Sequence, residues 1–216
     1  MPEFRRSDLQ NEIERIESKI EDLGLLTDLG AKSGRVAHIG CASGSQTFAL
    51  AWVLDPEEIV GLDLDTASAE EYLEEMRSLI SESSEALRFG RVSQDDRLWW
   101  NTQIPGFIQE NRLPTYLEGD ITAQTDLRAN SYDIVFCDHV LYHIYSDQGE
   151  DGVKSALKEM KRIVKKGGWI VAIEPNRSSH EESTHLDFTS IFDSLDLEPY
   201  SITNNGVITT YIYKKA

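Results

Sequence analysis

The sequence predicts a single α/β domain built on a doubly wound, mostly parallel, seven-stranded sheet. Strand and helix patterns alternate from residue 35 to residue 195, which predicts parallel strands covered by helices on both faces. Several strand segments are continuous apolar runs, as expected when both faces of a sheet are buried. Two further strand segments near the end of the chain flank Asn205-Gly206, a pair typical of an antiparallel hairpin turn.

A helical pattern precedes this domain. Residues 8–29 repeat apolar side chains at spacings of three and four, which predicts one amphipathic helix. We therefore expect residues 1–34 to form an N-terminal helical extension and residues 35–216 to form the main domain. The helix is expected to pack against that domain. A short dimerising coiled coil is the alternative, and a homodimer is a prediction on that basis.

The elements of the main domain can be placed from periodicity and breakers. Strands are predicted at 36–39, 59–62, 116–118, 132–137, 169–173, 199–204 and 207–213. Helices are predicted at about 45–54, 68–88, 151–166 and 186–195. Ser68 and Glu71 form a capping-box pattern at the second helix, and Gly167-Gly168 is expected to end the third.

One segment, at about 89–115, does not fit the alternation. It is too long and too aromatic for a plain connection. We expect an inserted lid or substrate-binding element, or alternatively a structural flap on the sheet edge. In the first case Trp99, Trp100 and Phe107 could form an apolar wall over a bound substrate.

The charge of the chain limits its partners. It carries 38 acidic and 21 basic residues, a net charge of −17. A surface this acidic repels a phosphate backbone, which argues against a nucleic acid partner. No apolar run approaches the roughly 20 residues that a membrane span needs, and residues 1–19 have no apolar signal core. We therefore expect a cytoplasmic protein with no membrane partner; the acidity would also suit a salt-rich cytoplasm.

Cysteines and histidines give no sign of a metal site. Cys41 and Cys137 are too few for a disulfide framework, and no Cys/His group has zinc-site spacing. His180 and His185 match no metal motif and are expected in a solvated loop and helix start. No metal is therefore expected.

Three strand ends carry small or acidic residues, at the edge where open parallel sheets bind ligands. Gly40 to Gly44 form a glycine-rich turn, where the backbone can approach a ligand closely and the next helix N-terminus favours a negative group. Asp63 ends the second strand, where a carboxylate can accept both hydroxyls of a ribose. Asp120 follows the third strand and could accept from an adenine amine, or serve only as a turn residue.

The fourth strand end carries Asp138, His139, Tyr142 and His143 within six positions. These side chains can donate, accept or titrate near neutral pH. Because this end faces the same edge of the sheet, we expect them in the same cleft as the glycine turn.

The order of these features resembles that of the class I S-adenosylmethionine-dependent methyltransferases, over residues 35–213 apart from the insert. The segments that carry the resemblance are 36–44, 59–65, 117–120, 132–137 and 157–174. The closing antiparallel hairpin is also typical of that family and separates it from ordinary NAD-binding domains. The resemblance implies a Rossmann-like methyltransferase fold and S-adenosyl-L-methionine as cofactor.

The resemblance also implies a set of cofactor-binding residues, namely His38, Gly40, Ala42, Gly44, Asp63, Asp120 and Asp138. Two of them depart from the family pattern. His38 stands where the family has an acidic residue near the positive amino-acid end of the cofactor, and Ala42 stands at the middle glycine. A histidine cannot replace that negative charge, so Asp138 is expected to compensate from the neighbouring strand.

The implied reaction is in-line methyl transfer to a small-molecule acceptor, in which alignment supplies much of the acceleration. His143 is expected to act as base or orienting residue, because many small-molecule members of the family have a histidine there. Tyr142 and His139 are the lesser candidates. The segment from Cys137 to Val140 lacks the Asn/Asp-Pro-Pro-aromatic pattern of enzymes that methylate nucleic acid bases, which favours a small molecule.

Two rival functions remain at this point. A non-catalytic protein that binds S-adenosylmethionine would be consistent with His38 and Ala42. An NAD-dependent oxidoreductase would share the glycine turn and Asp63. However, Gly40, Ala42 and Gly44 are evenly spaced and lack the two-residue gap of the dinucleotide fingerprint.

Overall fold

The computed structural model describes residues 14, 34–74, 76–77, 112–175, 187–204 and 208–216. The predictions for the N-terminal helix, for residues 89–111 of the insert and for the Asn205-Gly206 turn lie outside the described residues. Nothing in the structure therefore tests them.

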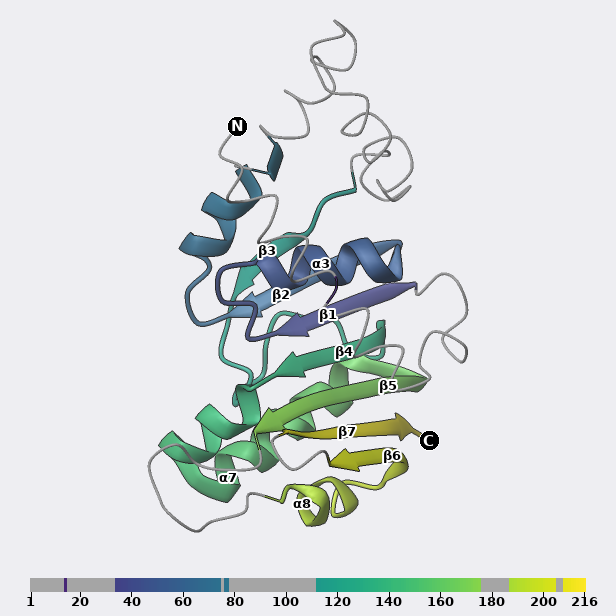
Figure 1. Cartoon of the computed structure of the whole chain (residues 1–216). Helices are drawn as coiled ribbons and strands as arrows, with labels where there is room; N and C mark the ends of the chain where they lie inside the picture. Colours follow the sequence, from purple (N-terminus) through teal and green to yellow (C-terminus); the bar gives the residue numbers. More distant parts are fainter. Residues whose placement is uncertain (1–13, 15–33, 75, 78–111, 176–186, 205–207) are drawn as a thin grey trace, which may run out of the picture.

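A seven-stranded sheet in the order β3-β2-β1-β4-β5-β7-β6 forms the centre of the domain (Figure 1). Neighbours from β3 to β5 are parallel, whereas β7 is antiparallel to both β5 and β6. This confirms the predicted mostly parallel sheet with a closing antiparallel hairpin. The strands are β1 (Arg35–Ile39), β2 (Glu58–Asp63), β3 (Thr115–Glu118), β4 (Tyr132–Asp138), β5 (Val164–Pro175), β6 (Leu197–Asn204) and β7 (Ile208–Lys215).

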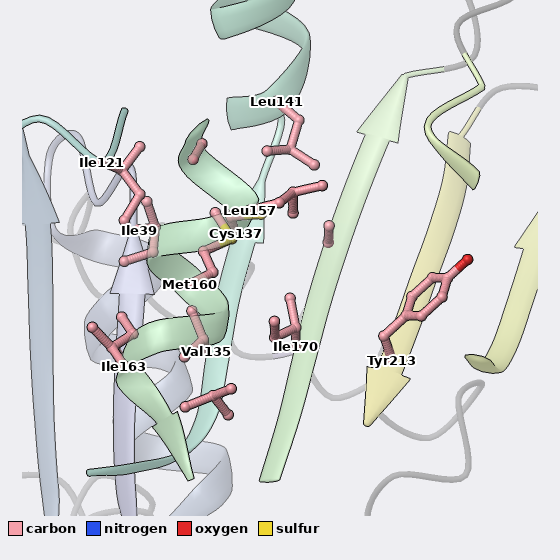
Figure 2. Close-up of a cluster of buried hydrophobic side chains, with 14 of the residues drawn as sticks. Ile39, Ile121, Val135, Cys137, Leu141, Leu157, Met160, Ile163, Ile170 and Tyr213 are labelled. Carbon is pink, nitrogen blue, oxygen red and sulfur yellow. The ribbon is translucent and has the colours of Figure 1, made fainter. Parts of the chain in front are cut away.

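Two apolar layers cover the sheet, one on each face. On one face, α3 (Ser45–Leu54) and the helix that begins at residue 67 pack against alternate residues of β1, β4 and β5. On the other face, α7 (Val140–Ile163) and α8 (Thr189–Asp193) pack against the intervening residues. Figure 2 shows Leu157, Met160 and Ile163 of α7 against Val135 of β4 and Ile170 of β5. Residues on successive positions of each strand therefore serve opposite layers.

The third predicted helix is longer at its start and shorter at its end than expected. α7 begins at Val140 instead of 151 and bends at Gly149, where φ is 66°. It ends at Ile163 because Val164 already pairs with Tyr132 of β4. Gly167 and Gly168 consequently lie in β5 and do not end the helix.

No helix in the described part of the chain is long and apolar enough to cross a membrane.

The helix after β2 also starts differently from the prediction. It begins at Ala67, and the Asp65 carboxylate accepts a hydrogen bond from the Ala67 N–H at 2.9 Å. Asp65 thus supplies the side-chain bond that was expected from Ser68, because a carboxylate two residues ahead satisfies a first-turn N–H equally well.

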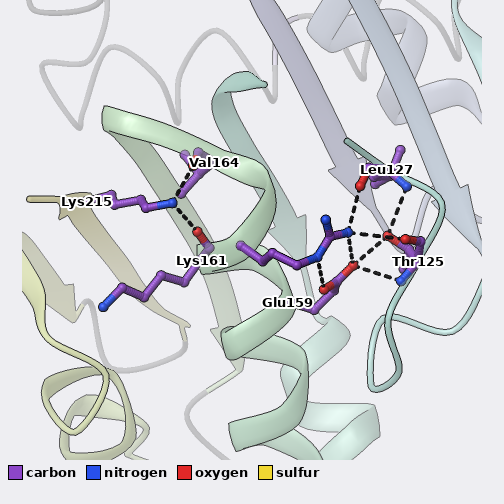
Figure 3. Close-up of polar contacts among 7 residues, drawn as sticks. Thr125, Leu127, Glu159, Lys161, Val164 and Lys215 are labelled. Atoms are coloured by element: carbon purple, nitrogen blue, oxygen red, sulfur yellow. Dashed lines mark hydrogen bonds and ion pairs between the residues drawn. The ribbon is translucent and has the colours of Figure 1, made fainter. Parts of the chain in front are cut away.

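A buried polar network ties the segment after β3 to α7 (Figure 3). The Thr125 N–H and hydroxyl both donate to Glu159 Oε1, at 2.8 and 2.7 Å. Arg162 donates to both Glu159 oxygens at 2.6 Å and to the Leu127 carbonyl at 2.6 Å. Burial opposes ionisation of Glu159, but the hydrogen bonds from Arg162 and Thr125 outweigh it and lower its pKa. The network therefore anchors residues 125–127 to α7, directly after residues 119–122, which line the ligand-binding edge of the sheet.

Candidate active site

A cleft of about 340 Å³ opens at the carboxyl ends of β1, β2, β3 and β4. This is the edge at which open α/β sheets bind ligands. Its lining residues come from four places along the chain. They are Ile39, Gly40 and Ala42; Leu62, Asp63 and Leu64; Gly119, Asp120, Ile121 and Thr122; and Asp138, His139, Val140, His143, Ile144, Asp147 and Gln148.

The glycine-rich turn forms the floor of the cleft. Gly40 has φ 72°, and a Cβ atom there would lie 2.3 Å from Val140 Cγ2, so the turn needs a residue without a side chain. Ala42 also has a positive φ, 44°, which is unusual for a residue with a Cβ. Gly44 (φ 80°) directly precedes α3 as its N-cap, and its carbonyl accepts from the Tyr116 hydroxyl at 3.2 Å. Gly44 belongs to the turn but is not among the residues that line the cleft.

Asp63 lies at the end of β2, beside the glycine turn. Its Oδ2 accepts a hydrogen bond from the Ala42 N–H at 2.7 Å, which joins two predicted cofactor-binding residues directly. The Asp63 side chain is half-buried and lines the cleft. The carboxylate is thus held in position from β1 while it remains open to a ligand.

Asp120 makes the local turn bonds that its position suggested. Its Oδ1 accepts from the Thr122 N–H at 2.8 Å and from the Thr122 hydroxyl at 2.7 Å, which is the local turn bonding. Asp120 is nevertheless exposed and lines the cleft next to Ile121. Leu64 lines the same end and is 74% exposed, an unusual exposure for a large apolar side chain.

Asp138 and His139 form a close pair at the end of β4. His139 Nδ1 lies 2.8 Å from Asp138 Oδ1. The Asp138 side chain is only 4% exposed, and its Oδ2 accepts a 2.6 Å hydrogen bond from Gln46 Nε2 on α3. His139 has φ 63°, a strained conformation for a residue with a side chain, and it precedes the first turn of α7. The pair therefore has a fixed place in the cleft.

His143 lines the cleft one turn further along α7, and it is exposed. Tyr142 is half-buried and does not line the cleft; its ring contacts the His143 ring edge-on, with centroids 5.2 Å apart. The structure thus brings two of the three predicted catalytic side chains, His139 and His143, to the cleft.

His38 does not line the cleft, although it stands at the family's acidic position. It is fully buried, and its Nδ1 lies 2.7 Å from the Thr47 hydroxyl on α3. Its ring also packs edge-on against Phe136. Because successive residues of a strand alternate between faces, His38 faces α3 while Ile39 lies at the cleft. His38 therefore joins β1 to α3 in this structure.

Glu174 is a site residue that sequence reasoning missed. It ends β5, is 1% exposed, and accepts hydrogen bonds from the Leu141 and Tyr142 N–H groups at 2.9 and 3.0 Å. It thereby satisfies the first turn of α7, which carries the cleft residues Val140 and His143. Burial raises the pKa of Glu174 to about 8, the Asp138 charge adds to that shift, and the two N–H donors oppose it. The signal available in the sequence was a single acidic residue, Glu174, at the end of an apolar strand segment.

The raised pKa of Glu174 predicts a pH-dependent stability. The native state holds a proton that an unfolded glutamate, with its ordinary pKa of 4.5, releases. This contribution is complete below pH 4.5 and is lost as the pH rises toward 8. Relative to Glu174→Gln, the wild type should therefore lose up to about 1.4 kcal/mol of unfolding free energy per pH unit in that window. Urea unfolding of both proteins across the window measures this, and parallel stability curves would contradict it.

The charge of the cleft is one-sided. Four aspartates, Asp63, Asp120, Asp138 and Asp147, line it, and no lysine or arginine is among its described lining residues. Among the described residues, no group of three or more His, Cys, Asp or Glu side chains is arranged to hold a metal ion. The described ionisable side chains that line the cleft are therefore four carboxylates and two imidazoles.

Comparison with known proteins finds a matching family model and solved structures of the same fold. Residues 101–172 match the family model of a methyltransferase domain. No curated protein sequence gives a significant match.

Solved structures share the fold at low sequence identity. A methyltransferase dependent on S-adenosylmethionine from Aquifex aeolicus is 14% identical with a TM-score of 0.56, over 95% of this chain and 98% of that chain. Magnesium protoporphyrin IX methyltransferase from Synechocystis, with bound S-adenosylmethionine, is 13% identical with a TM-score of 0.57, over 100% and 86%. The N-methyltransferase NodS from Bradyrhizobium japonicum, in complex with S-adenosyl-L-homocysteine, is 14% identical with a TM-score of 0.55, over 97% of each chain.

At such identities the structural likeness establishes the fold. The sheet order also separates the chain from NAD-binding domains, because β7 is inserted antiparallel between β5 and β6. The matching segment of sequence, 101–172, spans β3, β4, α7 and most of β5, and so includes the strand end that carries Asp138 and His139. The chain therefore has the fold of the class I methyltransferases that use S-adenosylmethionine, and residues 101–172 match the model of a methyltransferase domain.

Proposed function

We propose that the protein binds S-adenosylmethionine in the 340 Å³ cleft and transfers its methyl group to a small molecule. One observation carries the proposal: five of the seven predicted cofactor-binding residues, from four separate strand ends, line this single cleft. They are Gly40, Ala42, Asp63, Asp120 and Asp138.

The described residues fit the cofactor in shape and in charge. The missing side chain at Gly40 leaves room for close approach of a ligand to the backbone. Asp63 is positioned to accept the ribose hydroxyls, while Asp120, with Leu64 and Ile121 beside it, suits the adenine. Asp138 supplies the negative charge that His38 lacks, and it does so from the cleft, whereas His38 is buried behind β1.

When bound, S-adenosylmethionine supplies an electrophilic methyl carbon on a positively charged sulfur. The task of the chain is then to hold an acceptor in line with that carbon and to take up its proton. His139 and His143 are the described imidazoles that line the cleft. We propose that the base is one of these two, with His143 as the residue expected from the family pattern.

A small-molecule acceptor suits the size and charge of the site. The cleft lies at the lower end of the roughly 300–1,000 Å³ that is typical of small-molecule sites. Its acidic lining and the net charge of −17 disfavour a phosphate backbone.

A cytoplasmic location and a homodimer stay predictions. A protein that binds the cofactor without turnover is the alternative, and it would give binding but no S-adenosylhomocysteine product.

Removal of the Asp63 carboxylate tests the cofactor site. Asp63→Ala should weaken S-adenosylmethionine binding by at least about 100-fold, since hydrogen bonds to a charged group contribute roughly 1.5–3 kcal/mol each and two are lost. Isothermal titration calorimetry measures the change. Glu118→Ala is the matched control. Glu118 pairs in register with Asp63 but does not line the cleft, so its substitution removes the same charge from outside the site. Equal affinities of the two variants would rule out the proposed ribose contact.

A further inference from the structure

The acidic lining of the cleft includes one carboxylate that the proposed cofactor contacts do not use. Asp147 lies on α7, four residues after His143, so the two side chains share a face of the helix. Asp147 is exposed, and within the described part of the chain no hydrogen bond or ion pair engages it. Gln148 and Ile144 line the cleft beside it. This end of the cleft therefore presents a carboxylate, an imidazole, an amide and an apolar side chain.

The helical segment that carries these residues is separately fixed. Residues 140–148 precede the bend at Gly149, and Glu174 holds the first turn through the Leu141 and Tyr142 N–H groups. The side chains of His143 and Asp147 are thereby presented from one short, anchored piece of helix. The second part of α7, after the bend, packs under the sheet.

A proton acceptor lies in the same cleft. His139 Nδ1 lies 2.8 Å from Asp138 Oδ1, an ion-pair contact and not an aligned hydrogen bond. A negative charge this close favours the tautomer with the hydrogen on Nδ1, which leaves the lone pair on Nε2. Gln46 in turn holds Asp138 through a 2.6 Å hydrogen bond. Gln46 and Asp138 are therefore positioning residues for the His139 imidazole.

Charge decides which acceptors suit this site. A phenolate or carboxylate acceptor would enter a cleft lined by Asp63, Asp120, Asp138 and Asp147, with no described lysine or arginine to compensate. An ammonium group would instead be attracted by Asp147. A neutral amine that attacks a sulfonium ion gives a methylammonium ion, so the reacting pair keeps one positive charge throughout and the cleft stays compensated.

We propose, on the basis of the proposed function, that the methyl acceptor is an amine whose ammonium form is drawn into the cleft by Asp147 and, once there, loses its proton to Nε2 of His139. The nitrogen lone pair then forms the N–CH₃ bond while the C–S bond breaks and its electron pair remains on sulfur. The products are the methylated ammonium ion and neutral S-adenosylhomocysteine, with the first proton on His139. No oxidant or further reactant is needed.

The test uses the full chain saturated with S-adenosylhomocysteine and three probes of similar shape. These are phenethylamine (a cation), 2-phenylethanol (neutral) and 3-phenylpropionate (an anion), and binding is followed by heteronuclear NMR. We expect phenethylamine to bind at least about tenfold more tightly than 3-phenylpropionate at low salt, with shifts at residues 138–148, and the preference should shrink at about 0.5 M salt. Equal or tighter binding of the anion, or no binding of the amine, overturns the proposal.

The Asp147→Asn variant tests whether Asp147 causes the preference for the amine over the anion. It should reduce the cation-to-anion preference by about fivefold, on the order of one unit charge at a partly solvated site. Asp151→Asn is the matched control, since Asp151 is an exposed acid on the same helix that does not line the cleft. An unchanged preference in Asp147→Asn overturns the role of Asp147. Failure of S-adenosylhomocysteine itself to bind would refute the proposed function, whereas its binding without an amine preference overturns only this inference.

Discussion

Gly40→Ala should destabilise the protein by about 3 kcal/mol and weaken S-adenosylhomocysteine binding by more than tenfold. The new Cβ would lie 2.3 Å from Val140 Cγ2, at a position with φ 72°. A left-handed conformation costs a residue with a side chain roughly 1–2 kcal/mol, and overpacking adds roughly 1–3 kcal/mol. Relief of the contact must move either the glycine turn or the start of α7, and both line the cleft. Urea unfolding and calorimetry measure the two effects.

Gly167→Ala is the matched control for this change. Gly167 has a similar φ of 75°, but a Cβ there meets nothing within 4 Å. It should cost only the backbone strain, about 1 kcal/mol, and leave cofactor affinity unchanged. Val140→Ala in the Gly40→Ala background should recover part of the lost stability, because it removes the methyl group that the new Cβ meets. If Gly40→Ala and Gly167→Ala behave alike, the close approach of Gly40 to Val140 has no functional role.

Arg162→Ala should cost about 2 kcal/mol, below the roughly 3–5 kcal/mol for one partner of a fully buried ion pair, because the Arg162 side chain is 28% exposed. It leaves the Glu159 carboxylate, 6% exposed, with only the Thr125 donors, and it frees the Leu127 carbonyl. The 120–127 segment should loosen, so affinity for S-adenosylhomocysteine should fall as well. Chemical unfolding and calorimetry again give both values.

Lys158→Ala provides the comparison for Arg162. Lys158 is an exposed cation on α7, four residues before Arg162, and the structure assigns it no ion pair within the described residues. It should change the unfolding free energy by less than about 0.5 kcal/mol. A loss in Arg162→Ala no larger than in Lys158→Ala would mean that the network of Figure 3 does not hold the cleft wall.

The sheet and most of the cleft could be predicted because they depend on local patterns. Continuous apolar runs mark the parallel strands, and parallel strands bring their carboxyl ends to one edge. Asp63, Asp120 and Asp138 therefore meet in one cleft although they come from separate segments. The same logic placed the glycine turn beside them.

The start of α7 could not be predicted from its own sequence. The run Ser146-Asp147-Gln148-Gly149 is polar and ends in glycine, which is typical of a loop. The helix nevertheless begins at Val140, because Glu174 satisfies its first N–H groups from β5, some thirty residues away. Asp147 consequently enters the cleft, where no sequence pattern placed it.

His38 illustrates a different limit. Its position in the motif implied contact with the cofactor, but motif position does not say which face of the strand a side chain takes. Strand alternation places it with Val36 against α3, and Thr47 then provides a polar partner for the buried imidazole. We propose that Asp138 on the neighbouring strand supplies the charge that the motif requires.

The most direct test of the cofactor site is a crystal structure of the full chain grown with S-adenosylhomocysteine. We predict ligand density in the cleft, with the ribose hydroxyls at Asp63, the adenine between Leu64 and Ile121 beside Asp120, and the sulfur directed toward Asp138 and His139. Ligand density at another surface, or an empty cleft in crystals whose protein binds the ligand in solution, would contradict the proposed site.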